Sequence, residues 1–250
     1  MTTTKLKIIA CTAMLLDHLG VYFNFIILHV IGRIAFPIFA YLIVEGFFHT
    51  KNIKKYLIRL FAFAIISQIP YVLYFNGPFF DLEPANYSNP ILYLQTLNIF
   101  FTLFFGLLAI YVFDKNKKMG IVVLVILCII AQFTNADYGI YGILTIFLFY
   151  LFRGHFWKQT ISYSTLTILI LAKRLIKFAL RNYSVFVRCF GIALIAQIFS
   201  ILALVFIYFY NGKKGKNIKY IFYVFYPGHL LVLWFLRDVL SNINTFLFVG

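Results

Sequence analysis

Apolar runs of about 20 residues fill most of this chain, and short polar or basic segments separate them. A membrane-spanning helix needs about 20 predominantly apolar residues, so most of these runs have the length of one span. Hydrophobic residues make up 63% of the 250, whereas about 45–50% is usual in soluble domains. A chain this apolar can bury itself only in lipid. The sequence therefore predicts an all-α fold, a polytopic transmembrane helical bundle that forms one integral-membrane domain over residues 1–250.

The pattern predicts about eight or nine membrane helices. Pro37 and the polar residues 135–137 are expected to interrupt the apolar pattern. Residues 160–181 are ambiguous because Lys173 and Arg174 break their apolar run. This segment either spans the membrane, lies on its surface, or re-enters it to line a polar cavity. The expected ranges are 6–24, 28–48, 54–75, 91–113, 119–134, 138–152, 160–181, 184–210 and 219–240.

The distribution of lysine and arginine predicts the orientation, because cytoplasmic loops carry an excess of these residues. Four basic segments fall on one side of the membrane if successive helices alternate in direction, and the acidic loop 76–90 falls on the other. The N-terminus is therefore expected in the cytoplasm. The four basic segments are 5–7, 51–59, 115–118 and 153–158.

Basic cytoplasmic loops, which anionic lipid attracts, also explain the formal net charge of +15. Nucleic-acid binding is therefore not expected. One basic segment has to lie outside: the end of 160–181 if that segment spans, or 213–219 if it lies on the surface. The three cysteines, Cys11, Cys128 and Cys189, lack metal-ligand spacing and are interpreted as packing residues, so neither a disulfide nor a metal is expected.

The pair Asp17-His18 lies inside the first apolar run, where ionisable residues are costly and usually functional. Asp17, Arg33 and Glu45 would together cost roughly 7–10 kcal/mol if they were unpaired in lipid. We therefore expect them to face the bundle interior or water and to pair with one another, with at least one buried carboxylate–guanidinium contact among them. Arg33 has an alternative, because its long side chain can reach the membrane interface.

His18 is the strongest candidate for chemistry. A neutral histidine takes a proton from an attacking amine or hydroxyl, and a neighbouring carboxylate can orient its ring as in catalytic triads. Adjacent helical residues point about 100° apart, so Asp17 either orients His18 or holds another partner such as Arg33. No Gly-x-Ser-x-Gly motif or phosphate-binding loop occurs. If the site is catalytic, direct transfer of a group to an acceptor, with His18 as the base, is therefore favoured over a covalent serine intermediate.

Further polar residues lie in or beside the apolar runs. Tyr226 and His229 are one helical turn apart with a proline between them. This predicts a helix break that presents both side chains to a cavity. The alternative is an interfacial histidine within an aromatic belt. Gln68 and Asn98 are either substrate contacts or interhelical hydrogen-bond partners, and Asp137 either binds substrate or caps a helix.

Seven short motifs follow one another along about residues 1–150 and 195–238. They are Lys7-Ile8-Ile9-Ala10 with Asp17-His18, Gly32-Arg33 with Pro37, Glu45-Gly46 with His49, Ser67-Gln68 with Tyr71, Leu97-Asn98 with Thr102, Asp137-Tyr138-Gly139, and Tyr226-Pro227-Gly228-His229. In this order they resemble the TraX family, which is named for an enzyme that acetylates the amino terminus of conjugative pilin. Segment 155–195 carries none of these motifs and departs from the family pattern.

The resemblance implies an integral-membrane acyltransferase of a bacterial cytoplasmic membrane. It would transfer acetyl from acetyl-CoA to an amine or hydroxyl of an extracytoplasmic or membrane-bound acceptor, either a pilin or peptide N-terminus or a surface glycan. In the wider superfamily of multispanning acyltransferases, Arg-x-Ile-Ala precedes a catalytic histidine by eleven residues, and Lys7 and His18 have that spacing. The candidate catalytic residues are His18, Asp17, Arg33, Glu45 and His229, and the candidate substrate-binding residues are Tyr226, Gln68, Tyr71, Asn98 and Asp137.

The implied donor, coenzyme A, carries phosphates, so its site should be basic and open to the cytoplasm. Lys54, Lys55 and Arg59, at the start of the third run, are the candidates, although they also fit a role as topology signals.

Two other function classes remain open. A transporter of a small or proton-coupled solute is disfavoured because such proteins often contain internal repeats, and none is found in this sequence. A non-catalytic membrane assembly factor would leave the embedded polar residues unexplained.

Overall fold

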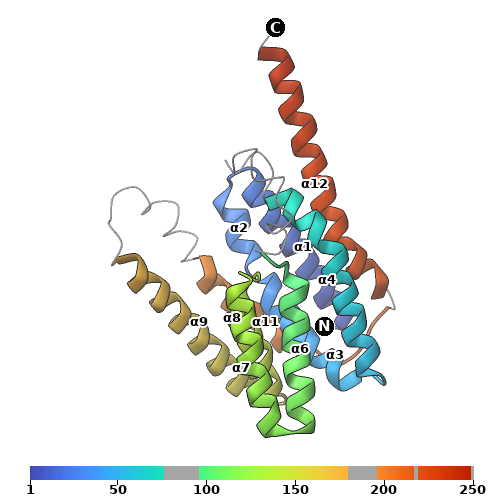
Figure 1. Ribbon diagram of the computed structural model, residues 1–250, viewed down its shortest axis with the longest axis vertical. Helices are drawn as coiled ribbons and strands as arrows, with labels where there is room; N and C mark the ends of the chain where they lie inside the picture. The colour runs from blue at the N-terminus through green and yellow to red at the C-terminus, as the bar shows by residue number, and fades with distance from the viewer. Residues whose placement is uncertain (76–95, 180–195, 217–218, 249–250) are drawn as a thin grey trace.

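All secondary structure in the described part of the chain is helical (Figure 1). The computed structural model describes residues 1–75, 96–179, 196–216 and 219–248. The predicted all-α class is confirmed for these residues. The helices are α1 (Thr3–Tyr22), α2 (Ile26–Gly32), α3 (Ala35–His49), α4 (Ile53–Phe75), α6 (Ile99–Lys115), α7 (Lys117–Phe133), α8 (Gly139–Leu151), α9 (Phe156–Ala179), the 3-10 helix η3 (Gln197–Leu202), α11 (Ala203–Tyr208) and α12 (Lys219–Phe248).

Two helical stretches in the described ranges are long and apolar enough to cross a membrane, Ile26–His49 and Ile53–Phe75. The outer faces of the bundle carry large apolar side chains; Phe133, for example, is 82% exposed. Helices that are apolar on all sides are typical of membrane spans or of deeply buried cores. The number of spans, predicted as about eight or nine, stays a prediction. Shorter apolar helices cover Gly139–Leu151, Gln197–Tyr208 and Tyr220–Leu236.

Helix α6 lies at the centre of the bundle, where it packs against α3, α4, α7 and α8. Its inward residues Leu107 and Ile110 are fully buried. Helix α1 packs against α2, α3 and α12, so the first and last helices of the described chain lie side by side. The C-terminal part of α12 extends beyond the other helices (Figure 1).

Two proline positions differ from the prediction. The break between α2 and α3 falls at Arg33 and Ile34, because Pro37 lies within the first turn of α3. There the missing N–H of proline has no intrahelical acceptor to lose. Pro227 lies inside the continuous helix α12. The expected interruption at Pro37 is therefore displaced by a few residues, and the expected helix break beside His229 is wrong.

The N-terminus is tied to the segment that precedes α12. The N–H of Thr3 donates to the carbonyl oxygen of Lys213 (2.8 Å), and Thr4 Oγ1 donates to the carbonyl oxygen of Lys216 (2.8 Å). Residues 213–216 therefore lie at the same end of the bundle as the N-terminus.

Helix α9 packs against α8 and η3 (Figure 1).

Several predictions fall outside the described residues. These are the polar loop 76–90, the start of the expected helix 91–113, much of the expected helix 184–210, and Cys189. Cys11 is buried and Cys128 is half-buried, as expected for packing residues.

Candidate functional site

His18 of α1 and His229 of α12 meet inside the bundle, and each is 8% exposed. His18 Nδ1 lies 2.7 Å from His229 Nε2, and the two rings stack with their centroids 4.9 Å apart. His229 Nδ1 lies 2.7 Å from the carbonyl oxygen of Phe225. The predicted proximity of the two histidines is confirmed, although 211 residues separate them.

These hydrogen bonds determine which ring nitrogens carry protons in the neutral pair. A carbonyl oxygen can only accept, so His229 Nδ1 carries a proton and donates to Phe225. His229 Nε2 is then an acceptor, and His18 Nδ1 must donate to it. The remaining nitrogen, His18 Nε2, keeps its lone pair. It is therefore the nitrogen of this pair that can take a proton from a substrate.

Helix α4 fixes the position of His18 from the other side. Tyr74 Oη donates to the backbone carbonyl oxygen of His18 at 2.7 Å. The rings of Tyr74 and Phe75 lie 5.5 and 5.6 Å from the His18 ring. With His229 stacked against it as well, the imidazole has a defined orientation.

Asp17 contacts α2. Its Oδ2 accepts a hydrogen bond from Arg33 Nη2, and its Oδ1 lies 2.7 Å from His29 Nδ1. The two helices come this close because Gly32 has no side chain: a Cβ added there would lie 2.6 Å from Asp17 Cα. The predicted contact between Asp17 and Arg33 is confirmed, and the Arg33 side chain is largely buried in this ion pair. Of the two alternatives for Asp17, the structure shows the one in which it holds Arg33.

The expected carboxylate–guanidinium contact among Asp17, Arg33 and Glu45 is thus present, but Glu45 takes no part in it and forms a separate ion pair. Arg153 Nε donates to Glu45 Oε1 at 2.8 Å, and His49 Nδ1 lies 3.7 Å from Glu45 Oε2. Glu45 follows the start of α3 by ten residues, which is about 15 Å along the helix axis. This distance separates Glu45 from the end of α3 that follows Arg33, and Arg153 neutralises its charge.

Gln68 and Asn98 bond to each other and to the backbone. Asn98 Nδ2 donates to Gln68 Oε1 (2.8 Å) and to the carbonyl oxygen of Ala64 (2.7 Å), while Gln68 Nε2 donates to that of Thr96 (2.7 Å). Asn98 Oδ1 also accepts from the N–H of Phe100 and so caps α6. The network joins α4 to α6, as the interhelical alternative predicts. A role of these residues in substrate binding stays a prediction.

Tyr226 and Tyr71 border the histidine pair. The Tyr226 ring is buried and meets the His229 ring at a steep angle, with the centroids 5.7 Å apart. Tyr71 is one step further away: its ring packs on Phe75 at 4.8 Å, and Phe75 contacts His18. Tyr226 is therefore the predicted substrate residue that the structure places closest to the site.

Asp137 lies in the turn between α7 and α8. The N–H of Asp137 donates to the carbonyl oxygen of Leu97 at 2.8 Å, and the carbonyl oxygen of Asp137 accepts a hydrogen bond from Thr102 Oγ1. It does not cap α8, because the N-cap position is Tyr138. Burial raises the pKa of the Asp137 carboxyl to about 6, although the nearby Arg33 opposes this shift. A substrate contact at Asp137 stays a prediction.

A cavity of about 410 Å³ lies between α1, α3, α4, α6 and α12. Apolar side chains such as Met14, Leu42 and Leu103 form much of its wall, and Tyr226 links it to His229. Four basic residues also line it: Lys7, Arg59, Lys214 and Lys216. Of the three predicted donor-binding residues, Arg59 alone lines this cavity; Lys54 and Lys55 are exposed to solvent instead.

The sequence-based reasoning missed His29 and treated Arg153 only as a topology signal. His29 lies four residues before Arg33, so helical spacing predicts that both share one face. Arg153 gives no comparable signal, because it meets Glu45 across 108 residues. Within the described ranges, no three His, Cys, Asp or Glu side chains converge as a metal site requires.

Fold and site together define a class: a strongly apolar, all-helical protein with a buried histidine pair beside a buried ion pair. The family model described as TraX protein matches residues 2–237. The chain belongs to the TraX family. It is also 32% identical over 186 residues to "Probable fimbrial assembly protein FimC, serogroup H1" of Dichelobacter nodosus, which covers 68% of this chain and 71% of that protein. No solved structure matches the chain.

Proposed function

We propose that this protein is an integral-membrane acyltransferase that moves acetyl from acetyl-CoA to an amine or hydroxyl group. The observation that carries the proposal is the protonation pattern of the buried His18 ring: Nδ1 donates to His229, so Nε2 holds a lone pair that can accept a proton. A general base positioned in this way contributes about 10²–10⁴-fold to a rate. The family relationship adds the expectation of an acetyl-CoA donor.

In the proposed reaction, His18 Nε2 removes a proton from the acceptor N–H or O–H while that atom bonds to the acetyl carbonyl carbon. The carbon–sulfur bond of the thioester then breaks, and the sulfur leaves with the electron pair. The proton passes from Nε2 to the thiolate, which returns His18 to its starting state. Because Nδ1 stays bonded to His229, both proton transfers use Nε2.

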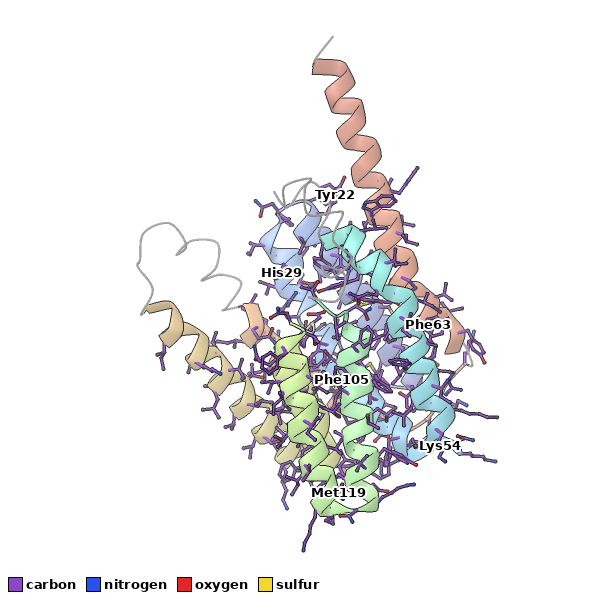
Figure 2. All side chains as sticks on the ribbon, viewed as in Figure 1. Tyr22, His29, Lys54, Phe63, Phe105 and Met119 are labelled. Carbon is purple, nitrogen blue, oxygen red and sulfur yellow. The ribbon has the colours of Figure 1, made fainter. Side chains whose placement is uncertain are left out.

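The proposed setting is a bacterial cytoplasmic membrane, crossed about eight or nine times. Lys54 and Met119 lie at one end of the bundle, while Tyr22 and His29 lie toward the other (Figure 2). The basic segments 51–59, which contains Lys54, and 115–118, which precedes Met119, thus lie at one end, and this supports a cytoplasmic N-terminus. The contact of residues 213–216 with the N-terminus supports the alternative in which residues 160–181 span.

The proposed acceptor is an extracytoplasmic or membrane-bound amine or hydroxyl, either a peptide N-terminus or a surface glycan. The printed name of the relative from Dichelobacter nodosus concerns fimbrial assembly, which favours a fimbrial or pilin-like subunit. The same name supports a second candidate, a non-catalytic factor in fimbrial assembly. That role gives no account of the unprotonated Nε2 of the buried His18.

The test uses the full chain in lipid nanodiscs with acetyl-CoA that is labelled in the acetyl group. Peptides with a free amino terminus should gain the label, and the same peptides with a blocked terminus should not. Simple glycans form a parallel arm for hydroxyl acceptors. If the folded protein neither transfers the acetyl group nor hydrolyses acetyl-CoA, the acyltransferase proposal is contradicted. That result would favour the assembly factor.

A further inference from the structure

The cavity between α1, α3, α4, α6 and α12 combines an apolar wall with four basic side chains. The proton transfers proposed at His18 do not require these basic side chains. We propose that this cavity is the donor site, and that its occupant is a phosphopantetheinyl thioester whose phosphate groups bind Lys7, Arg59, Lys214 and Lys216. This inference rests on the proposed acyl transfer and says where the donor binds.

The four basic residues gather at one end of the bundle. Lys7 lies in the second turn of α1, and Arg59 lies in the second turn of α4. The carbonyl oxygens of Lys214 and Lys216 accept hydrogen bonds from Thr4 Oγ1 at 3.0 and 2.8 Å. This pairing holds the 214–216 segment over the first turn of α1 and so forms a basic mouth.

One of these side chains has unused hydrogen-bonding capacity. Arg59 Nε is buried and has no hydrogen-bond partner in the described structure, while its guanidinium lies 5.8 Å from the Tyr56 ring. Buried donors in folded proteins almost always have an acceptor. An anion bound in the cavity would supply that acceptor.

Glu45 also lines the cavity, and an unpaired carboxylate there would repel phosphate. Arg153 removes that obstacle, because its Nε bonds Glu45 Oε1 at 2.8 Å. The carboxylate is thus compensated, and the four cations leave the mouth positive. A positive, partly apolar cavity concentrates anionic ligands.

The distances fit a pantetheine arm. Lys7 and His18 are eleven residues apart on one helix, about 16 Å along its axis. The arm between phosphate and sulfur has about 13 bonds, which extend to about 15 Å at roughly 3.5 Å for every three bonds. Phosphate at the basic mouth therefore puts the thioester level with His18. Met14, one turn before His18, lines the cavity at that end.

The cavity volume fits the arm better than the whole of coenzyme A. At about 410 Å³, it lies near the lower limit of small-molecule sites, about 300–1,000 Å³. The nucleotide end is then expected at the mouth, beside the lysines. A carrier protein with a phosphopantetheine group would present the same chemistry.

The test measures binding of coenzyme A to the full chain in nanodiscs by calorimetry. Replacing Lys7, Lys214 and Lys216 together by Gln should raise the Kd at least about tenfold, because three charge-assisted contacts are lost. The matched control, Lys54→Gln with Lys55→Gln, removes exposed lysines outside the cavity and should change the Kd less than about twofold. Equal Kd values for the triple variant and the unmodified protein would overturn the proposal.

A second variant covers the case in which the triple variant does not fold. Arg153→Gln exposes the cavity to the charge of Glu45 and should also raise the Kd, and adding Glu45→Gln should restore binding. Free 4′-phosphopantetheine should compete with coenzyme A, and lack of competition contradicts the proposal. Stronger competition by a loaded carrier protein than by coenzyme A would identify the carrier as the source.

His18→Gln separates this proposal from the proposed function, because it should keep the Kd for coenzyme A and lose transfer. If the unmodified protein binds coenzyme A through these lysines and never transfers acetyl, the site stands and the acyltransferase fails. If it transfers acetyl while the triple variant binds normally, the acyltransferase stands and the site fails.

Discussion

The bundle contains two buried polar clusters, a tyrosine cluster and the histidine site. They differ in whether every polar group has a hydrogen-bond partner within its own cluster. In the tyrosine cluster, between α8, α9 and η3, each hydroxyl has a partner inside the cluster. Tyr141 Oη donates to Tyr163 Oη (2.9 Å), Tyr163 Oη lies 2.6 Å from Ser200 Oγ, and Gln197 Nε2 donates to Tyr141 Oη (3.2 Å). Thr167 completes it.

The histidine site differs in containing an imidazole nitrogen that can accept a proton and, next to it, a buried donor without a partner. His18 Nε2 keeps its lone pair once Nδ1 is bonded to His229, and Arg33 Nε is buried without a partner among the described residues. A buried polar group without a partner costs about 1–3 kcal/mol. We infer that the tyrosine cluster holds helices together, and that the histidine site is kept incomplete for a substrate.

The largest expected effect is the loss of acetyl transfer when His18 is replaced, which tests whether the two clusters differ in function. His18→Gln retains a polar side chain of similar size but cannot act as a base. The rate of acetyl transfer should fall by about 10²–10⁴-fold, and circular dichroism should remain helical. Transfer at the unmodified rate by this folded variant would show that both clusters are structural.

The next effect concerns the ion pair behind His18. Arg33→Gln leaves the buried carboxylate of Asp17 without its guanidinium, which should cost about 3–5 kcal/mol. The measurement is the thermal unfolding midpoint in nanodiscs. Adding Asp17→Asn should recover much of the loss, because no unpaired charge remains. An unchanged midpoint in the single variant would mean that this ion pair does not support the site.

A smaller effect tests the close approach of α1 and α2. Gly32→Ala places a Cβ 2.6 Å from Asp17 Cα, and such overpacking should cost about 1–3 kcal/mol. The matched control is Gly228→Ala in α12, where an added Cβ meets no atom within 4 Å. The control should be neutral or slightly stabilising, since alanine favours helix. Equal unfolding midpoints for the two variants would contradict this packing.

The smallest effect belongs to the tyrosine cluster. Tyr163→Phe removes one hydroxyl and leaves partners such as Ser200 less satisfied, which should cost about 1 kcal/mol of stability. The transfer rate should stay within about twofold of the unmodified protein, because no proton transfer uses this cluster. A large loss of rate at unchanged stability would place catalytic function in the wrong cluster.

The helices were largely predictable because lipid imposes a strong length and composition rule. The expected helices 119–134 and 138–152 correspond to α7 (Lys117–Phe133) and α8 (Gly139–Leu151). Helix α12 was underestimated, since its expected end was residue 240 and it reaches Phe248. Periodicity says little about where a helix ends once apolar residues continue past the bundle.

Within the site, sequence predicted best those contacts whose loss would leave a charge unpaired in lipid. The pairing of Asp17 with Arg33 was predictable because an unpaired charge in lipid is expensive. The pairing of Glu45 with Arg153 was not, because sequence gives no distance between residues 108 positions apart. Lys214 in the cavity mouth was obscured for a similar reason: its carbonyl oxygen accepts hydrogen bonds from the N–H and Oγ1 of Thr4, and no pattern in the sequence predicts that contact.

The most direct test of the account is the protonation state of the two histidine rings. Nitrogen-15 NMR of histidine-labelled protein in bilayers separates protonated from unprotonated ring nitrogens, and the spectra of His18→Gln and His229→Gln assign the signals. The account predicts that both rings carry their proton on Nδ1, so that the His18 Nε2 signal is that of a free lone pair. A His18 signal with the proton on Nε2 would contradict it, because the site would then present no base to an acceptor.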